Sequence, residues 1–163
     1  MVLVKPINVL FRVLTGGADV IDLITIPPLI VLTVIYGASL NPSFVQILIY
    51  LTLLINGFLI ATSFYIAIIA LGIVTLEIDH SVMIYRDLTN LGKLPVDIYK
   101  EPLKGFLTYI IPVGIMVTLP GRAIMGLTTW IGVITSLAAG VVFMYLSLKF
   151  WRFALTKYTS ASS

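Results

Sequence analysis

The sequence has 163 residues, of which 60% are hydrophobic and only 10% are charged, and its formal net charge is +3. Ordinary soluble domains carry about 25% charged residues, so this chain cannot cover a soluble surface and is interpreted as an integral membrane protein. It contains no cysteine, which excludes disulfide bonds and thiolate metal sites.

The first predicted element is an amphipathic helix in the N-terminal stretch KPINVLFRVLTGG. Its apolar residues fall at helical spacing on one face, namely Ile7, Leu10, Phe11 and Leu14. One interpretation is a helix that lies at the membrane interface. The other is a docking helix for a cytoplasmic partner, with Ile7, Phe11 and Arg12 as its contact residues. The stretch lacks the apolar core and cleavage site of a signal peptide, so none is predicted.

Four apolar segments are long enough to cross a bilayer, whose core of roughly 30 Å takes about 20 helical residues. They run from about 21 to 38, 44 to 76, 103 to 119 and 129 to 148. The second is longer than a bilayer needs, so it is expected to tilt or to project into water. The predicted fold is therefore an all-α integral membrane protein with four transmembrane helices.

The basic residues indicate how these four spans are oriented. One side of the membrane would hold residues 1–20, the loop 77–102 with the first residues of the third span, and the tail after 148. It carries nine of the ten basic residues, namely Lys5, Arg12, Arg86, Lys93, Lys100, Lys104, Lys149, Arg152 and Lys157. The other side carries only Arg122. Lys and Arg concentrate in cytoplasmic loops, so both termini are predicted to be cytoplasmic and the protein to lie in the plasma membrane.

The loop 77–102 is predicted to hold a second amphipathic helix followed by an extended elbow. The stretch EIDHSVMIYRDLTNLG can place Tyr85 on its apolar side and both Arg86 and Asp87 on its polar side. Pro95 pushes the preceding residue into extended geometry, and Pro102 suits the first turn of the next helix. The charges are either a solvated face or a surface for a soluble partner.

Two prolines are predicted to act as hinges around the third span. Pro112 lies inside that span, where a proline frees a carbonyl and bends the helix. Pro120 and Gly121 are expected to break the helix again. Residues 123–127 would then form a short helix at the outer face or one that re-enters the membrane.

Small and polar residues inside the second and fourth spans predict helix contacts. Gly132, Ser136 and Gly140 are each four residues apart, a spacing that lets two helices approach closely, within one chain or between chains. Asn56 is the only amide well inside the second span. Since an unpaired amide in lipid is costly, we expect it to make a structural hydrogen bond rather than a substrate contact.

The sequence offers little for catalysis. His80 is the only histidine and lies in the stretch EIDH, which makes a poor transition-metal site. No GxSxG, HExxH or P-loop pattern occurs. Away from their ends, the predicted membrane-buried segments contain no carboxylate of the kind that proton-driven pumps use. If the protein moves a substrate, the energy is expected to come from elsewhere.

Two segments resemble the membrane subunits of ABC exporters of the ABC-2 type permease class, closest to a bacterial subfamily of small six-span permeases. They are GKLPVDIYKEPLKGFLTYIIPVGIMVTLPGRAIMG and the tail FWRFALTKYTSASS. The matching positions are Pro95, Asp97, Ile98, Tyr99, Leu107, Thr108, Ile111, Pro112, Val113 and Pro120, then Trp151, Arg152, Tyr158, Thr159, Ser160 and Ala161. Lys100 stands where the family usually has proline, and Leu119 where it has an aromatic residue. The chain is expected to be a single permease domain over residues 1–163 that lacks the first two spans.

The resemblance implies a non-catalytic subunit for efflux whose cytoplasmic loops dock on a separate ATP-binding cassette subunit. The coupling loop would include Tyr85, Arg86, Asp87, Pro95, Asp97 and Tyr99. ATP and Mg would be bound by the partner, and this chain would bind no cofactor and no metal. The other expected partners are a second permease copy or a paralogue and the lipid bilayer; nucleic acid is not expected.

Two other functions stay open from the residues. A non-transport membrane scaffold or assembly protein would use the same loops to bind a partner that is not an ATPase, and co-purification distinguishes the two. A membrane enzyme acting on lipid would use the EIDH cluster at the interface. Alanine at both Asp79 and His80 tests the enzyme, because unchanged activity and binding would leave it without catalytic residues.

Overall fold

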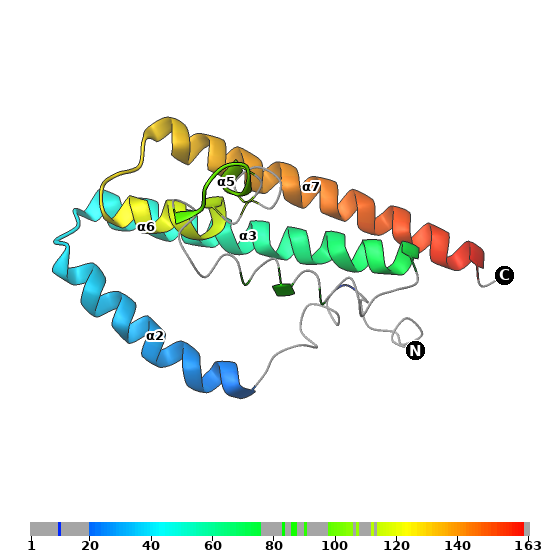
Figure 1. Cartoon of the computed structure of the whole chain (residues 1–163), viewed down its shortest axis with the longest axis horizontal. Helices are drawn as coiled ribbons and strands as arrows, with labels where there is room; N and C mark the ends of the chain where they lie inside the picture. Colours follow the sequence, from blue (N-terminus) through cyan, green and yellow to red (C-terminus); the bar gives the residue numbers. More distant parts are fainter. Residues whose placement is uncertain are drawn as a thin grey trace. The chain divides into compact units, whose positions relative to one another are not determined.

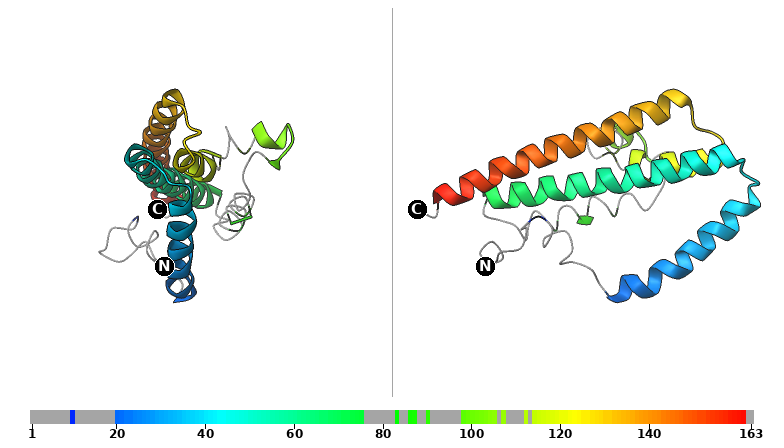
Figure 2. Two further views of the ribbon diagram at one scale, coloured as in Figure 1. Left: turned by 90° about the vertical axis from the view of Figure 1, so that its left-hand side faces the viewer. Right: turned by 180° about the vertical axis from the view of Figure 1, so that it is seen from behind.

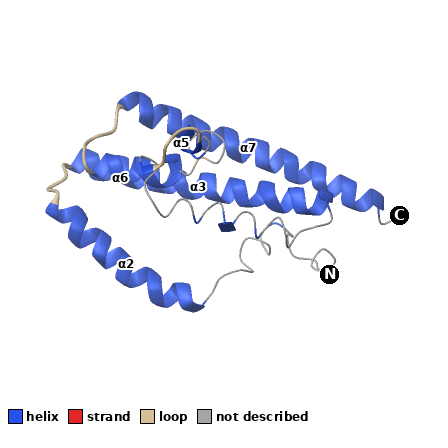
Figure 3. Ribbon diagram, viewed as in Figure 1, coloured by secondary structure: helices blue, strands red, loops and turns tan. Residues whose placement is uncertain are grey.

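The computed structural model describes residues 10, 20–75, 83, 86–87, 90, 98–105, 107, 112 and 114–161. Over these residues all regular secondary structure is helical, as Figure 3 shows, which confirms the all-α prediction. The elements are α2 (Val20–Ser39), α3 (Phe44–Thr75), α5 (Leu103–Gly105), the π-helix η4 (Gly114–Thr118), α6 (Leu119–Ile124) and α7 (Trp130–Ala161). The chain divides into two units, Met1–Pro42 and Ser43–Ser163, and each is described by itself.

The first unit contains α2, a 20-residue apolar helix close to the predicted span 21–38. It continues through Pro27 and Pro28, although each proline removes one backbone N–H donor. Its leucine, isoleucine and valine side chains from Leu23 onward are exposed. A contiguous apolar surface of this kind is typical of a helix that meets lipid or another protein.

The second unit is built on α3, which begins with a capping box. Ser43 N–H donates to Gln46 Oε1 at 2.7 Å, and Gln46 N–H donates to Ser43 Oγ at 3.4 Å, so each residue satisfies a free donor of the other. From there the helix runs 32 residues without a charge, about 48 Å. Its bounds agree with the predicted span 44–76.

The long helix α7 runs beside α3 and in the same direction (Figures 1 and 2). Its buried residues recur every three, four or seven positions and form one seam, namely Val133, Ser136, Gly140, Ser147, Trp151 and Ala154. This spacing keeps one face of a helix against its neighbour. The fourth span was predicted to end at residue 148, but α7 continues as a regular helix through its basic residues to Ala161.

The segment before α7 corrects the predicted break at Pro120 and Gly121. The π-helix η4 leads directly into α6, and Pro120 lies in the first turn of α6, where a proline costs no hydrogen bond. The helical path ends instead at Gly126, whose φ of 72° is in the left-handed region. Gly126 N–H donates to Ala123 O at 3.1 Å and Leu127 N–H to Arg122 O at 2.9 Å, which is a Schellman motif. Residues 123–127 are therefore the end of α6 and its turn, not a separate helix.

Among the described residues two helices are long and apolar enough to cross a membrane. They are Phe44–Thr75, with a mean hydropathy of 2.3, and the part of α7 at Trp130–Lys157, with a mean hydropathy of 2.0. A shorter apolar helix covers Leu23–Ser39. The predicted third span is described only in part, through α5, Leu107, Pro112 and η4.

Candidate functional site

The contact between α3 and α7 centres on one buried amide. Asn56 Nδ2 donates to the backbone oxygen of Ser136 at 2.9 Å and lies 3.0 Å from its Oγ, and both residues are buried. The predicted structural hydrogen bond of Asn56 is therefore confirmed. Thr52, which the sequence places roughly on the same face, is exposed and bonds only within its own helix, to Leu48 O.

Gly140 lets α3 approach α7 one turn further along. A Cβ built on Gly140 would meet Asn56 Oδ1, and it would lie 3.2 Å from Leu59 Cδ2. Any side chain at this position would therefore displace the amide from its bonds to Ser136. Gly132 is different, because a Cβ there would meet only Thr128 and Thr129 within 4 Å. Of the three small residues, Ser136 and Gly140 contact α3 directly.

The π-helix η4 lies against α3 at Gly57, the residue after Asn56, and its backbone makes the contact. A Cβ on Gly57 would lie 2.7 Å from the carbonyl oxygen of Met116 in η4. Met116 N–H donates to Pro112 O at 3.0 Å, and Pro112 is fully buried. A π-helical turn within a helical segment often marks a functional position. Here it follows directly after the predicted hinge proline.

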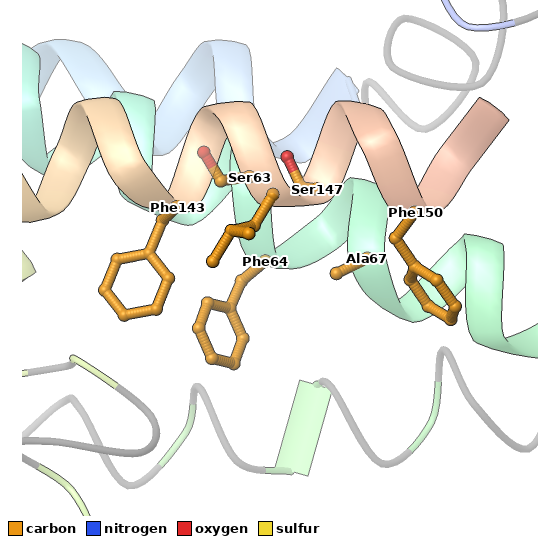
Figure 4. Close-up of a pocket in the computed structure, with 7 residues that line it drawn as sticks. Ser63, Phe64, Ala67, Phe143, Ser147 and Phe150 are labelled. Atoms are coloured by element: carbon orange, nitrogen blue, oxygen red, sulfur yellow. The ribbon is translucent and has the colours of Figure 1, made fainter. Parts of the chain in front are cut away.

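A pocket of about 250 Å³ opens between α3 and α7 toward their C-terminal ends. Figure 4 shows its lining, which comes from Ser63, Phe64, Ala67, Phe143, Leu146, Ser147 and Phe150. The Phe64 and Phe143 rings meet edge to face, with centroids 5.8 Å apart. Both serine hydroxyls donate to backbone oxygens of their own helices, so they offer no free donor to a ligand. The pocket therefore suits an apolar group.

The elbow before the third span is capped by a carboxylate. Glu101 Oε2 accepts a hydrogen bond from Gly105 N–H at 3.0 Å, and Lys104 N–H donates to Lys100 O at 3.0 Å. Ile98 is exposed and Tyr99 half-buried. The carboxylate stabilises the first turn of α5, where backbone N–H groups have no helical partner.

The comparisons with known proteins assign the sequence of the chain to a family. A family model described as "ABC-2 family transporter protein" matches residues 1–162. The chain belongs to the ABC-2 transporter family. It is therefore a membrane permease of an ABC transporter, as the sequence resemblance predicts. No curated protein and no solved structure matches the chain.

Family membership identifies the chain as a membrane subunit, but the structure describes only part of the predicted coupling loop. Met83, Arg86, Asp87 and Asn90 are helical and exposed, and their spacing of three, four and seven residues puts them on one face. Tyr85, Pro95 and Asp97 lie outside the described residues, as do the N-terminal Ile7, Phe11 and Arg12. The EIDH stretch also lies outside them. Over the described part of the chain, no three His, Cys, Asp or Glu residues gather where they could hold a metal ion.

Sequence reasoning missed two features of the structure, the aromatic pocket between α3 and α7 and the backbone contact at Gly57. The pocket aromatics are ordinary apolar residues in two spans about 80 positions apart, so their meeting depends on how the helices pair. Gly57 is one of twelve glycines, and only its position beside Asn56 inside an apolar span distinguishes it in the sequence. A small residue beside Asn56 inside an apolar span was the available signal, since small residues allow close helix approach.

Proposed function

We propose that the chain is the membrane-spanning permease subunit of an ABC exporter, which couples ATP hydrolysis on a separate ATP-binding subunit to efflux of its substrate. The observation that carries this proposal is the family match across residues 1–162. We further propose that the chain binds no cofactor itself, that ATP and Mg are held by the partner, and that a second permease copy or a paralogue completes the membrane part.

The direction of the helices supports four spans. Since α3 and α7 run side by side in the same direction (Figure 1), the chain must return along their length between Thr75 and Trp130. The packing of η4 and α6 against α3 lies on that return path. With α2, whose 20 residues match a bilayer core, this gives the four predicted crossings.

Charge at the two ends of the second unit supports cytoplasmic termini. The C-terminal end of α7 carries Lys149, Arg152 and Lys157, whereas Arg122 in α6 belongs to the end where α3 and α7 begin (Figure 1). By the positive-inside rule, the former end faces the cytoplasm. The exposed face of Arg86 and Asp87 then lies in a cytoplasmic loop, available to an ATP-binding subunit.

Coupling would run from this loop through the elbow into the third span. The loop face is exposed, Glu101 fixes the first turn of α5, and the π-helix beyond Pro112 contacts α3. Movement of the docked subunit would thereby reach α3 and its partner α7. Pro112 and the π-helical turn are the points where the segment can bend.

Co-purification tests the proposal. The tagged chain is expressed with its chromosomal neighbours, extracted in mild detergent, and the proteins that accompany it are identified. We expect a stoichiometric ATP-binding subunit. Reversing both loop charges, Arg86→Asp with Asp87→Arg, is expected to abolish this recovery or the stimulation of its ATPase, because like charges placed opposite each other at an interface cost several kcal/mol.

The control is Arg122→Asp, which reverses a single basic charge on the predicted outer side of the membrane and should leave recovery unchanged. Membrane insertion of each variant is checked by extraction with alkaline carbonate. A well-inserted wild-type chain that brings down no ATP-binding subunit would contradict the proposal, and loss of insertion in the double variant would assign the loop face a folding role instead.

A further inference from the structure

One side of α7 carries an aromatic stripe that ends in a lysine. Phe143, Phe150 and Lys157 are seven residues apart, two helical turns each, so they lie on one side of the helix. Phe150 and Phe153 stack with ring centroids 6.4 Å apart. Lys157 Nζ lies 5.8 Å from the centroid of the Phe153 ring, so the ammonium reaches back toward the pocket.

The pocket at the start of this stripe fits a hydrocarbon chain better than a polar solute. Its volume of about 250 Å³ is below the roughly 300–1,000 Å³ of most small-molecule sites. An apolar cavity of about 150 Å³ already suffices to bind benzene. Because the Ser63 and Ser147 hydroxyls are engaged by backbone, the free lining is aromatic and aliphatic.

Charge favours an anionic head group beside this chain. The sequence of α7 contains three basic residues and no Asp or Glu. At about 100° per residue, Lys157 falls on the same side as Phe143 and Phe150, while Arg152 is turned to the opposite side. Lys149 is turned about 100° away from Phe150, so Lys157 is the one cation of the three that continues the stripe from the pocket.

The depth of these groups matches that of a lipid. The uncharged run of α7 ends at Leu148, so the pocket occupies the last turns of the apolar span. Phe153 lies four residues beyond Lys149, about 6 Å along the axis, within the interfacial layer of roughly 5–8 Å. The Lys157 ammonium above the Phe153 ring is thus at head-group level, where long basic side chains reach lipid phosphates.

We propose that the α3–α7 pocket binds part of one acyl chain of an anionic phospholipid, whose phosphate is held by Lys157. The lipid comes from the leaflet at the C-terminal ends of α3 and α7. Only the assignment of this leaflet as the cytoplasmic one rests on the proposed function. An acyl chain in this pocket would pack between α3 and α7, in the same helix contact that the Asn56–Ser136 hydrogen bond holds further along. The bound lipid would therefore stabilise the pairing of α3 with α7.

Native mass spectrometry of the full chain in detergent tests the head-group contact, with phosphatidylglycerol and phosphatidylcholine of the same acyl chains as probes. We expect the first phosphatidylglycerol to bind about fivefold more tightly than phosphatidylcholine, as one basic residue near an anionic lipid supplies. Lys157→Gln should remove this preference, and Arg152→Gln, the same change on the other side of α7, should retain it. An equal loss in both variants would show diffuse surface attraction and overturn the site.

Photo-crosslinking tests the pocket itself, with a phosphatidylglycerol that carries a photoactivatable acyl chain. Crosslinks are expected within residues 63–67 and 143–150. Ala67→Phe should fill the pocket and reduce them at least tenfold, whereas Ala138→Phe, the same change on an exposed face of α7, should not. Helix content by circular dichroism verifies folding; if Ala67→Phe fails to fold, the crosslink positions in the wild type decide.

Crosslinks spread evenly over the exposed faces of the helices would overturn the proposal, as would occupation of the pocket by a second copy of the chain. Recovery of an ATP-binding subunit is measured in the same preparations. Specific lipid binding without that subunit would contradict the proposed function but not the lipid site. Recovery of the subunit without specific lipid binding would contradict the lipid site but not the proposed function.

Discussion

At the scale of single residues, Asn56 contributes most directly to holding the second unit together, because its buried amide joins α3 to α7 among apolar side chains. Asn56→Ala is expected to lower the free energy of unfolding by about 0.6 kcal/mol and by no more than about 1.7 kcal/mol, the average and the maximum measured for interhelical hydrogen bonds in a membrane protein. Ser136→Ala should cost less, because the backbone oxygen of residue 136 still accepts the stronger of the two contacts, at 2.9 Å. Reversible unfolding in mixed micelles measures both values.

Thr52→Ala is the control for this prediction, since Thr52 is exposed and bonds only to Leu48 O in its own helix. It should change the stability by only a few tenths of a kcal/mol. If Thr52→Ala cost as much as Asn56→Ala, the amide would have no special role in joining α3 to α7.

The sequence could predict that Asn56 is paired, since a buried amide needs a partner, but it could not identify Ser136. That pairing depends on the register of two helices 80 residues apart.

At the scale of elements, the close contact between η4 and α3 is the most sensitive feature. Gly57→Ala is expected to destabilise the second unit by about 1–3 kcal/mol, the usual cost of overpacking, because the new methyl group would press on the backbone oxygen of Met116. Unlike a side chain, that oxygen moves only if the whole π-helical turn moves. Unfolding in mixed micelles and the transport rate of the assembled complex are the measurements.

Gly121→Ala is the matched control, because a Cβ on Gly121 meets nothing within 4 Å. Replacing glycine by alanine inside a helix favours the helix by roughly 0.5–1 kcal/mol, so this variant should be as stable as the wild type or more so. Equal destabilisation by both substitutions would mean that the Gly57–Met116 contact does not matter. The contrast is sharp because the chemical change is identical.

The element boundaries show which signals in the sequence are reliable. The bounds of α3 were predictable within a residue, because the polar turn at residues 41–43 precedes its start and the first charge, Glu77, follows its end. The end of α7 was not predictable, since the length of the apolar run indicates where the membrane span ends and not where the helix ends. The end of α6 was misplaced because Pro120 lies in the first turn, where proline is tolerated, and a single glycine such as Gly121 weakens a helix without ending it. The π-helix could not be predicted, since the sequence GIMVT carries no pattern that distinguishes a π-helical turn from an α-helical one.

At the scale of the whole molecule, the parallel course of α3 and α7 makes the topology testable. The chain contains no cysteine, so single cysteines can be introduced without background labelling. We choose the exposed positions Phe44→Cys, Leu127→Cys and Thr156→Cys, one at the start of α3 and one near each end of α7. In intact cells a membrane-impermeant maleimide should label residues 44 and 127 but reach residue 156 only after permeabilisation.

Labelling of residues 44 and 127 from the same side tests the parallel course of α3 and α7. Labelling of residue 156 from the other side tests whether α7 crosses the bilayer. Labelling of residue 156 alone would mean that the molecule is inverted, contrary to the distribution of its basic residues. Equal labelling of residues 127 and 156 would mean that α7 does not cross. Labelling of 44 and 127 from opposite sides would contradict the return crossing between α3 and α7, and with it the four-span arrangement.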